Sequence, residues 1–191
     1  MGRCAVLIDG GYLNKVCENE YNKANLHFGL LSNDVVGTNS ERLRTYYYHC
    51  MPYQSNPPTS EEQQRHRAMS QFIFNLEKMP RFQFRQGKLQ KIQGTFRQKR
   101  VDILFAVDLV RLSATHQIDR VVLFTGDSDM VPAIEVAKDE GVVVQIYYSP
   151  KSIHDELLKV CDERFEITKT LIDKWKVPAA PVAAIAGPPN K

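Results

Sequence analysis

Cysteine is scarce in this sequence, and the spacing of the few present excludes the common zinc and redox motifs. Four cysteines occur among 191 residues, and no two of them form a Cys-x-x-Cys pair. The chain opens without the charged and apolar regions of a secretory leader. No apolar run approaches the ~20 residues that cross a bilayer. We therefore expect a cytoplasmic protein with reduced thiols and no membrane partner.

The excess of positive over negative charge is also small. The chain carries 25 basic and 22 acidic residues, which gives a formal net charge of +3. That balance does not by itself indicate a nucleic-acid-binding protein. The length and the 43% hydrophobic content fit one globular domain. We predict a domain over residues 1–176 and a flexible tail, rich in proline and alanine, over residues 177–191.

Short apolar runs rich in β-forming residues alternate with helical patterns along the chain. The predicted strands are Cys4–Ile8, Arg42–Cys50, Phe82–Arg85, Arg120–Thr125, Val142–Tyr148 and Phe165–Ile167. The predicted helices are Tyr12–Glu20, Glu61–Lys78 with Ser60 as its cap, Val101–Thr115, Met130–Glu140 and Ile153–Cys161. The Val101–Thr115 helix is apolar around most of its surface, which predicts deep burial. Residues 22–40 are expected to form a loop or a short helical excursion. The pattern predicts a three-layer α/β/α, Rossmann-like fold around a mostly parallel sheet.

Four aspartates occupy positions where such a fold places functional sites. Asp9 ends the first predicted strand, Asp127 and Asp129 follow the Arg120–Thr125 strand, and Asp102 begins a helix. Carboxyl ends of parallel strands line one crevice of the sheet. Carboxylates gathered there repel one another unless a hard cation such as Mg²⁺ or Mn²⁺ offsets their charge. Each aspartate alone fits a turn or a helix cap, but the four together favour a metal site.

Three motifs resemble those of the NYN domain family. They are Ile-Asp-Gly-Gly-Tyr-Leu-Asn at residues 8–14, Lys-Arg-Val-Asp at residues 99–102, and Thr-Gly-Asp-Ser-Asp-Met-Val-Pro at residues 125–132. Met130 stands where the family usually has phenylalanine. The resemblance spans about residues 4 to 165, and the LabA-like bacterial branch is the most similar.

This resemblance implies a PIN-like nuclease fold and Mg²⁺- or Mn²⁺-dependent cleavage of RNA phosphodiesters. It assigns catalytic and metal-binding roles to the four aspartates at positions 9, 102, 127 and 129. It implies that Asn14 assists by hydrogen bonding and that Ser128 fixes its turn and contacts nucleic acid. Asp108 also matches a family position. It lies six residues after Asp102, roughly 120° away on an ideal helix, so an arginine-paired structural role fits it equally well.

Basic residues cluster before the second motif. Lys99 and Arg100 directly precede the Val-Asp pair, and Arg97 lies in a stretch where basic and aromatic residues alternate. Such a stretch can bind a single strand by charge and stacking, and we expect single-stranded RNA as the partner. A solvated hairpin with inward-packed aromatic rings fits the pattern equally well. The sequence also leaves a homodimer open.

Other functions remain open from the sequence. The same fold could serve as an inactive RNA-binding or protein-binding module, or it could cleave DNA or structured flaps. An aspartyl phosphatase is disfavoured because Gly11, and not a second acid, stands two residues after Asp9. Tyr46, Tyr47 and Tyr48 are expected to pack within the sheet, and no histidine pairs with a nucleophile in a recognisable pattern.

Overall fold

The structure of this chain is a computed structural model. It describes the backbone of residues 1–92 and 95–177 and the side chains of residues 1–88 and 100–177. The predicted tail over residues 177–191 therefore lies outside the described residues, apart from Val177.

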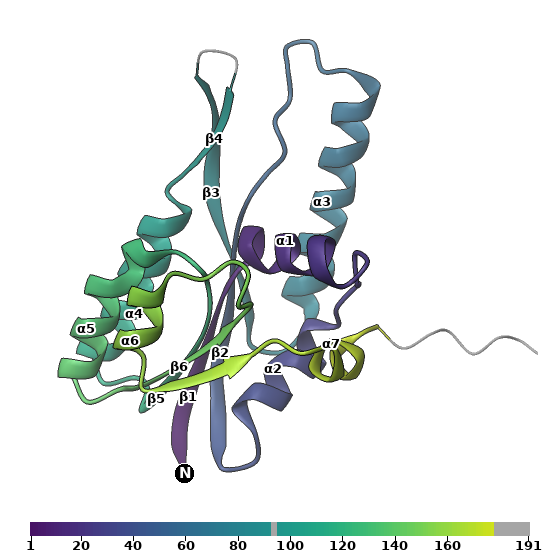
Figure 1. The fold of residues 1–191 in the computed structure, drawn as a ribbon. Helices are drawn as coiled ribbons and strands as arrows, with labels where there is room; N and C mark the ends of the chain where they lie inside the picture. Colours follow the sequence, from purple (N-terminus) through teal and green to yellow (C-terminus); the bar gives the residue numbers. More distant parts are fainter. Residues whose placement is uncertain (93–94, 178–191) are drawn as a thin grey trace, which may run out of the picture.

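Seven strands form one sheet at the centre of the molecule (Figure 1). In chain order they are β1 (Gly2–Asp9), β2 (Ser40–Cys50), β3 (Phe82–Ile92), β4 (Thr95–Lys99), β5 (Arg120–Phe124), β6 (Val143–Tyr148) and β7 (Glu163–Glu166). Their order across the sheet is β4-β3-β2-β1-β5-β6-β7. All neighbours run parallel except β3 and β4, which form an antiparallel hairpin. The predicted mostly parallel sheet is confirmed.

Helices cover both faces of the sheet. One face carries α1 (Gly10–Glu20), α2 (Phe28–Val36), α3 (Ser60–Lys78) and α7 (Lys169–Trp175). The other carries α4 (Val101–Ala114), α5 (Val131–Asp139) and α6 (Asp155–Val160), with a single turn of 3₁₀ helix, η1 (Ser128–Met130), before α5. The predicted three-layer α/β/α arrangement is confirmed. Among the helices of the described ranges, none is long and apolar enough to cross a membrane.

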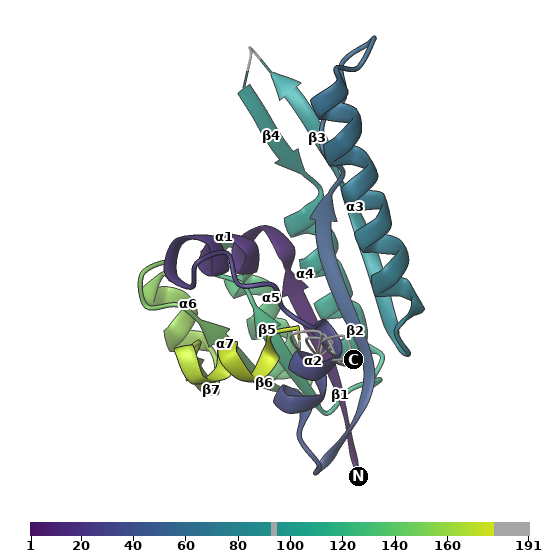
Figure 2. The same ribbon diagram turned by 90° about the vertical axis from the view of Figure 1, so that its right-hand side faces the viewer.

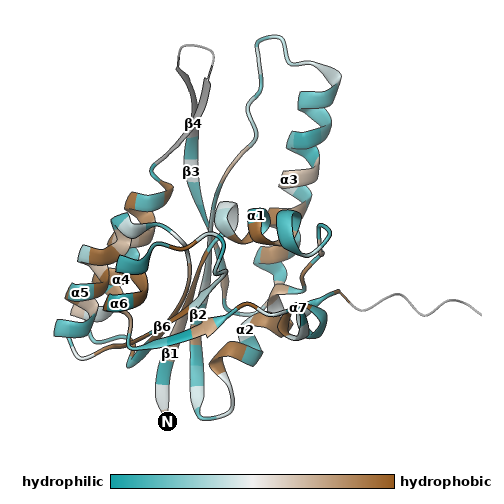
Figure 3. Cartoon of the chain, viewed as in Figure 1, coloured by the Kyte–Doolittle hydropathy of each residue, from teal (hydrophilic) through white to brown (hydrophobic). Residues whose placement is uncertain are grey.

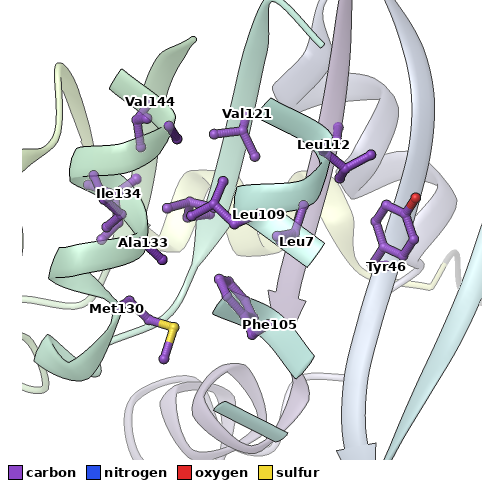
Figure 4. Packing of buried hydrophobic residues seen from close by; sticks show 14 of the residues in the cluster. Leu7, Tyr46, Phe105, Leu109, Leu112, Val121, Met130, Ala133, Ile134 and Val144 are labelled. Carbon is purple, nitrogen blue, oxygen red and sulfur yellow. The ribbon is translucent and has the colours of Figure 1, made fainter. Parts of the chain in front are cut away.

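Strand β1 lies in the middle of the sheet and divides its side chains between two cores. Ala5 and Leu7 pack toward α4 and α5, while Cys4, Val6 and Ile8 pack toward α1 and α2. All five are fully buried, which is why the run reads as continuously apolar. Figure 4 shows Leu7 among side chains from β5, α4 and α5. Each large side chain buried in this way stabilises the fold by about 1.5–3 kcal/mol.

The cap of helix α3 differs from the prediction. Thr59, and not Ser60, is the cap: its hydroxyl accepts from the Glu62 amide at 3.2 Å. The Glu62 carboxylate accepts in return from the Thr59 amide at 2.9 Å and from the Ser55 amide at 3.1 Å. This reciprocal pair satisfies two backbone donors at once, so the helix begins one residue earlier than expected.

Helix α4 is buried along one stripe rather than around its surface, which corrects the expected deep burial. Phe105 and Leu109 face the core, while 66% of Ile103 and 55% of Val107 are exposed. A helix packed on one side of a sheet hides only the residues that face it. Helix α7 was not predicted. It is fixed by Trp175, a fully buried residue whose indole N–H donates to Asp34 at 2.8 Å.

Two segments project past the carboxyl end of β1. The β3–β4 hairpin and the first half of α3 rise beyond the rest of the molecule in both ribbon views (Figure 1, Figure 2). The projecting part of α3 is mainly hydrophilic (Figure 3). Helix α1, which begins where β1 ends, lies at the base of both projections. They therefore stand beside the edge of the sheet where the predicted site residues lie.

Candidate active site

Asp9 is the last residue of β1, and its side chain caps α1 directly behind it. Its Oδ1 accepts hydrogen bonds from the backbone amides of Gly11, at 2.8 Å, and Tyr12, at 3.1 Å. Only glycine fits at position 10, because a Cβ there would stand 2.5 Å from the ring of Tyr47. The carboxylate is thereby oriented through one of its two oxygens.

Asp127 and Asp129 follow β5 in a second turn at the same edge of the sheet. Strands β1 and β5 are parallel neighbours, with Ile8 paired to Phe124, so their carboxyl ends are adjacent. Oδ1 of Asp127 accepts from the Asp129 amide at 3.0 Å and caps the 3₁₀ turn. Asp127 is partly buried and Asp129 is exposed.

The ring of Tyr12 joins the two turns. A Cβ on Gly126 would stand 2.5 Å from this ring and 2.3 Å from the carbonyl oxygen of Ser152. The Tyr12 hydroxyl also accepts from the Ser149 amide at 2.9 Å. The glycine before Asp127 is therefore required by close packing against the helix that Asp9 caps.

Asp102 enters the site from a third element. It lies in the first turn of α4, where the helix dipole favours a negative charge. The preceding Arg100 has a φ of 74°, a left-handed conformation that turns the chain from β4 into the helix. Asp102 is exposed, as expected for a charged residue at a helix start.

The four carboxylates influence one another electrostatically. Burial raises the pKa of Asp9; the Tyr12 and Gly11 amides lower it, and the charges of Asp102 and Asp127 raise it further. Burial also raises the pKa of Asp102, and the charges of Asp127 and Asp129 add to this. Residues that are up to 120 positions apart in the sequence thus share one negative region.

No described cation neutralises this region. None of the four aspartates forms an ion pair with a lysine or arginine whose side chain the structure describes. Among residues 1–88 and 100–177, no three acidic, cysteine or histidine side chains already converge as a closed set of metal ligands. All available donors are carboxylate oxygens, which Mg²⁺ and Mn²⁺ prefer. Mg²⁺ needs only one or two direct carboxylates and completes its shell with water, so this donor set fits such an ion.

Asp108 lies apart from this group. Its carboxylate pairs with Arg85 through two contacts of 2.8 Å and with Arg111 at 3.3 Å, and it accepts from the Tyr48 hydroxyl at 3.0 Å. The residue is 4% exposed. These partners occupy its oxygens and give it a structural role, which is one of the two alternatives that the sequence left open.

The remaining predicted residues lie around the acidic region. Asn14 is exposed on α1 and its side chain hydrogen-bonds the Tyr47 hydroxyl. Ser128 begins the 3₁₀ turn between Asp127 and Asp129, and Arg100 is exposed. The side chains of Lys99 and Arg97 lie outside the described ones, although the backbone of both belongs to β4.

Comparison with known proteins identifies a family for the chain. The profile of the NYN domain matches residues 3–169, which include every aspartate named above. The chain belongs to the NYN domain family. Membership implies a nuclease, and it does not by itself single out the LabA-like branch. The family match confirms the resemblance drawn from the three sequence motifs.

Two individual proteins resemble this NYN domain. The uncharacterised protein y4oD of Sinorhizobium fredii is 32% identical over 111 residues, which are 54% of this chain and 52% of the relative. The NYN domain therefore aligns with about half the length of that relative. A crystal structure of a protein of unknown function from Vibrio parahaemolyticus has a TM-score of 0.61 at 18% identity, covering 92% of this chain and 96% of the other. That likeness supports the fold alone.

Sequence reasoning missed the aromatic residues that support the site. Tyr46, Tyr47 and Tyr48 are buried in the sheet, as predicted. However, Tyr47 also contacts Gly10 and Asn14, and Tyr12 contacts the Gly126 turn. The signal in the sequence was Gly10 and Gly126, which stand beside the aspartates. Such glycines indicate that another part of the chain packs closely against the backbone, but they do not show which residue does so.

Proposed function

We propose that this NYN domain is a metal-dependent ribonuclease that hydrolyses RNA phosphodiester bonds at its acidic region. The observation that carries the proposal is the mutual effect of charge among Asp9, Asp102, Asp127 and Asp129. None of these carboxylates forms an ion pair with a lysine or arginine whose side chain is described. An arrangement that costs electrostatic energy in the free protein is typical of a site built for a ligand.

Mg²⁺ or Mn²⁺ would be held among these four carboxylates, with one or two of them as direct ligands and water as the others. Such an ion, when bound, acidifies water and neutralises the charge that builds up on a phosphate under attack. Asp9 and Asp127 each have one oxygen fixed by backbone amides, which orients the other oxygen in advance. Asn14 is placed on α1 to hydrogen-bond an acid or the substrate, which makes it an assisting residue.

Substrate binding would involve the residues that flank the acids. Arg100 is exposed next to Asp102, and Ser128 lies between Asp127 and Asp129. Lys99 and Arg97 precede them on β4, so the hairpin can contribute positive charge to a phosphate backbone. We propose single-stranded RNA as substrate, because an unpaired strand can bend into a site between projecting segments.

The decisive experiment compares nucleic acids and metals directly. Purified protein is incubated with end-labelled single-stranded RNA, double-stranded RNA and single-stranded DNA of one sequence, each with Mg²⁺, Mn²⁺ or a chelator. We expect cleavage of the single-stranded RNA with either metal and none with the chelator. RNA that is bound but never cut would reject a nuclease in favour of a binding module. Preferential cutting of DNA would reject RNA as the substrate.

A further inference from the structure

A cavity of about 240 Å³ lies beside the acidic region, between α1, α2, β2 and α3. Asn14 of α1 and Tyr47 of β2 both line it, and both also belong to the surroundings of Asp9. The charge of Asp9 acts on the Tyr47 hydroxyl, and Gly10 packs against the Tyr47 ring. The cavity is therefore separated from the proposed catalytic acid by little more than one side chain.

The walls of this cavity are aromatic and hold one another in place. Phe28 and Phe72 both contact the Tyr47 ring edge-on, with centroids 5.0 and 5.2 Å away, and Phe28 and Phe72 lie 5.8 Å apart. The volume is below the roughly 300–1,000 Å³ of sites for drug-sized ligands. Rigid aromatic walls around a small space favour a flat, ring-shaped ligand.

One buried polar atom in the wall of the cavity, on His49, has no partner among the described residues. His49 lines it two residues after Tyr47, on the same face of β2. Its Nδ1 is buried and has no hydrogen-bond partner within the described residues. Burial lowers the pKa of His49, so the ring is neutral at physiological pH and offers one donor and one acceptor. Asn14 and Asn25, which also line the space, each offer both kinds of group.

A buried imidazole nitrogen without a hydrogen-bond partner costs free energy. We infer that a ligand supplies the missing hydrogen bond. We propose that this cavity binds one unstacked nucleobase of the RNA, next to the bond that is cut, and that His49 recognises the edge of that base. The proposal rests on the proposed ribonuclease function, because it puts the base next to the catalytic acid Asp9. His49 is then a specificity-determining residue, and the aromatic walls accept the faces of the base.

Binding of the base is tested without any cleavage. The histidine ring signals are followed by NMR in chelator while AMP, GMP, CMP or UMP is added to millimolar concentration, with ribose 5-phosphate as the control. We expect at least one nucleotide, but not the sugar phosphate, to shift the His49 signals. In the variants, affinity is followed by the signals of the nucleotide itself. H49F should bind that nucleotide about tenfold more weakly, as loss of a hydrogen bond near 1.4 kcal/mol would imply. H49Q, which keeps a donor and an acceptor, should recover part of the affinity.

The matched control is H116Q, because His116 is an exposed histidine beyond the far end of α4. It should bind nucleotide as the unaltered protein does. Circular dichroism establishes that each variant is folded. No His49 shift with any of the four nucleotides, or equal affinity in folded H49F and H49Q, would overturn the proposal.

Cleavage gives a second, independent readout. On RNA of mixed sequence we expect a base preference at one fixed position relative to the cut, which H49F flattens while cutting continues. Cutting with a preference that H49F leaves unchanged would reject the cavity as the base site and leave the nuclease intact. Absence of all cutting would reject the nuclease, while the nucleotide titration would still decide whether the cavity binds a base.

Discussion

Asp102 and Asp108 lie on the same helix, six positions apart, in opposite surroundings. Asp108 is buried, with two arginines and a tyrosine hydroxyl on its oxygens. Asp102 is exposed as a residue and has no described cationic partner. Partial desolvation of its carboxyl group raises its pKa, and the charges of Asp127 and Asp129 raise it further. The residue type is the same, so the surroundings alone decide that one carboxylate holds the fold together and the other is available to a ligand.

The comparison separates stability from function. Removing a carboxylate from the Asp108 cluster leaves two arginines without their counter-charge, which costs stability. Replacing one carboxylate of the acidic region by asparagine keeps a side-chain oxygen for capping and relieves repulsion, so we expect it to cost function more than stability. Each of the following predictions tests one side of this contrast.

The largest expected effect is on catalysis at Asp127. D127N should reduce metal-dependent RNA cleavage by at least about a thousandfold, because several kcal/mol of charge stabilisation in the transition state are lost. Thermal unfolding should show an intact fold. The matched control is D139N, which changes an exposed aspartate at the end of α5 and should cleave normally. Cleavage by D127N at the unaltered rate would refute the assignment.

The next effect is on stability at Asp108. D108A should lower the free energy of unfolding by about 3 kcal/mol, since a buried partner of two arginines is removed. Urea denaturation measures the change. Molecules of this variant that remain folded should still cleave RNA. An unaltered urea midpoint would show that the arginine cluster contributes nothing.

A smaller effect is expected from the metal itself. A ligand present at 100 times its Kd stabilises a protein by about 2.7 kcal/mol. For a chain of this length that corresponds to a Tm increase of about 5–10 °C. Differential scanning fluorimetry with Mn²⁺ should show this increase, and D9N should lose most of it. Equal increases in both proteins would place the ion elsewhere.

The smallest effect is the relief of desolvation and repulsion at the Asp102 carboxylate. Its pKa is raised in the folded protein, so folding loses stability as pH rises from about 4, where a free aspartate ionises, through the folded value. Without metal, D102N should therefore be more stable at pH 7 by up to about 1 kcal/mol. The gain should vanish near pH 3, where both states hold the proton. Urea denaturation at the two pH values gives this difference, and a loss of stability at pH 7 would contradict it.

Much of the fold was predictable because its strands are locally encoded. Fully buried runs such as Cys4–Ile8 and Val121–Phe124 can be recognised as strands within four or five residues. Helix α7 was missed because its formation depends on the burial of Trp175 and its bond to Asp34, a residue distant in the sequence. The burial of α4 was overestimated for a similar reason, because composition does not show which side of a helix packs against the sheet.

The candidate site was predictable only in part. Asp9, Asp127 and Asp129 follow strands, and strand ends in a parallel sheet meet at one edge. Asp102 was included only as a carboxylate at a helix start, because nothing local in the sequence places the start of α4 beside β1 and β5. Tyr12, Tyr47 and His49 have roles that arise from contacts across the sheet and between turns. No residue spacing in the sequence predicts such contacts.

The most direct test of the central claim is a Mn²⁺ titration followed by electron paramagnetic resonance of the free ion. The unaltered protein, D9N, D127N and D108N are compared under conditions where each is folded. We predict that D9N and D127N bind Mn²⁺ at least about tenfold more weakly than the unaltered protein, as loss of a carboxylate ligand implies, while D108N binds it equally well. Unchanged affinity in D9N and D127N, or a loss confined to D108N, would contradict a metal site built from the acidic region.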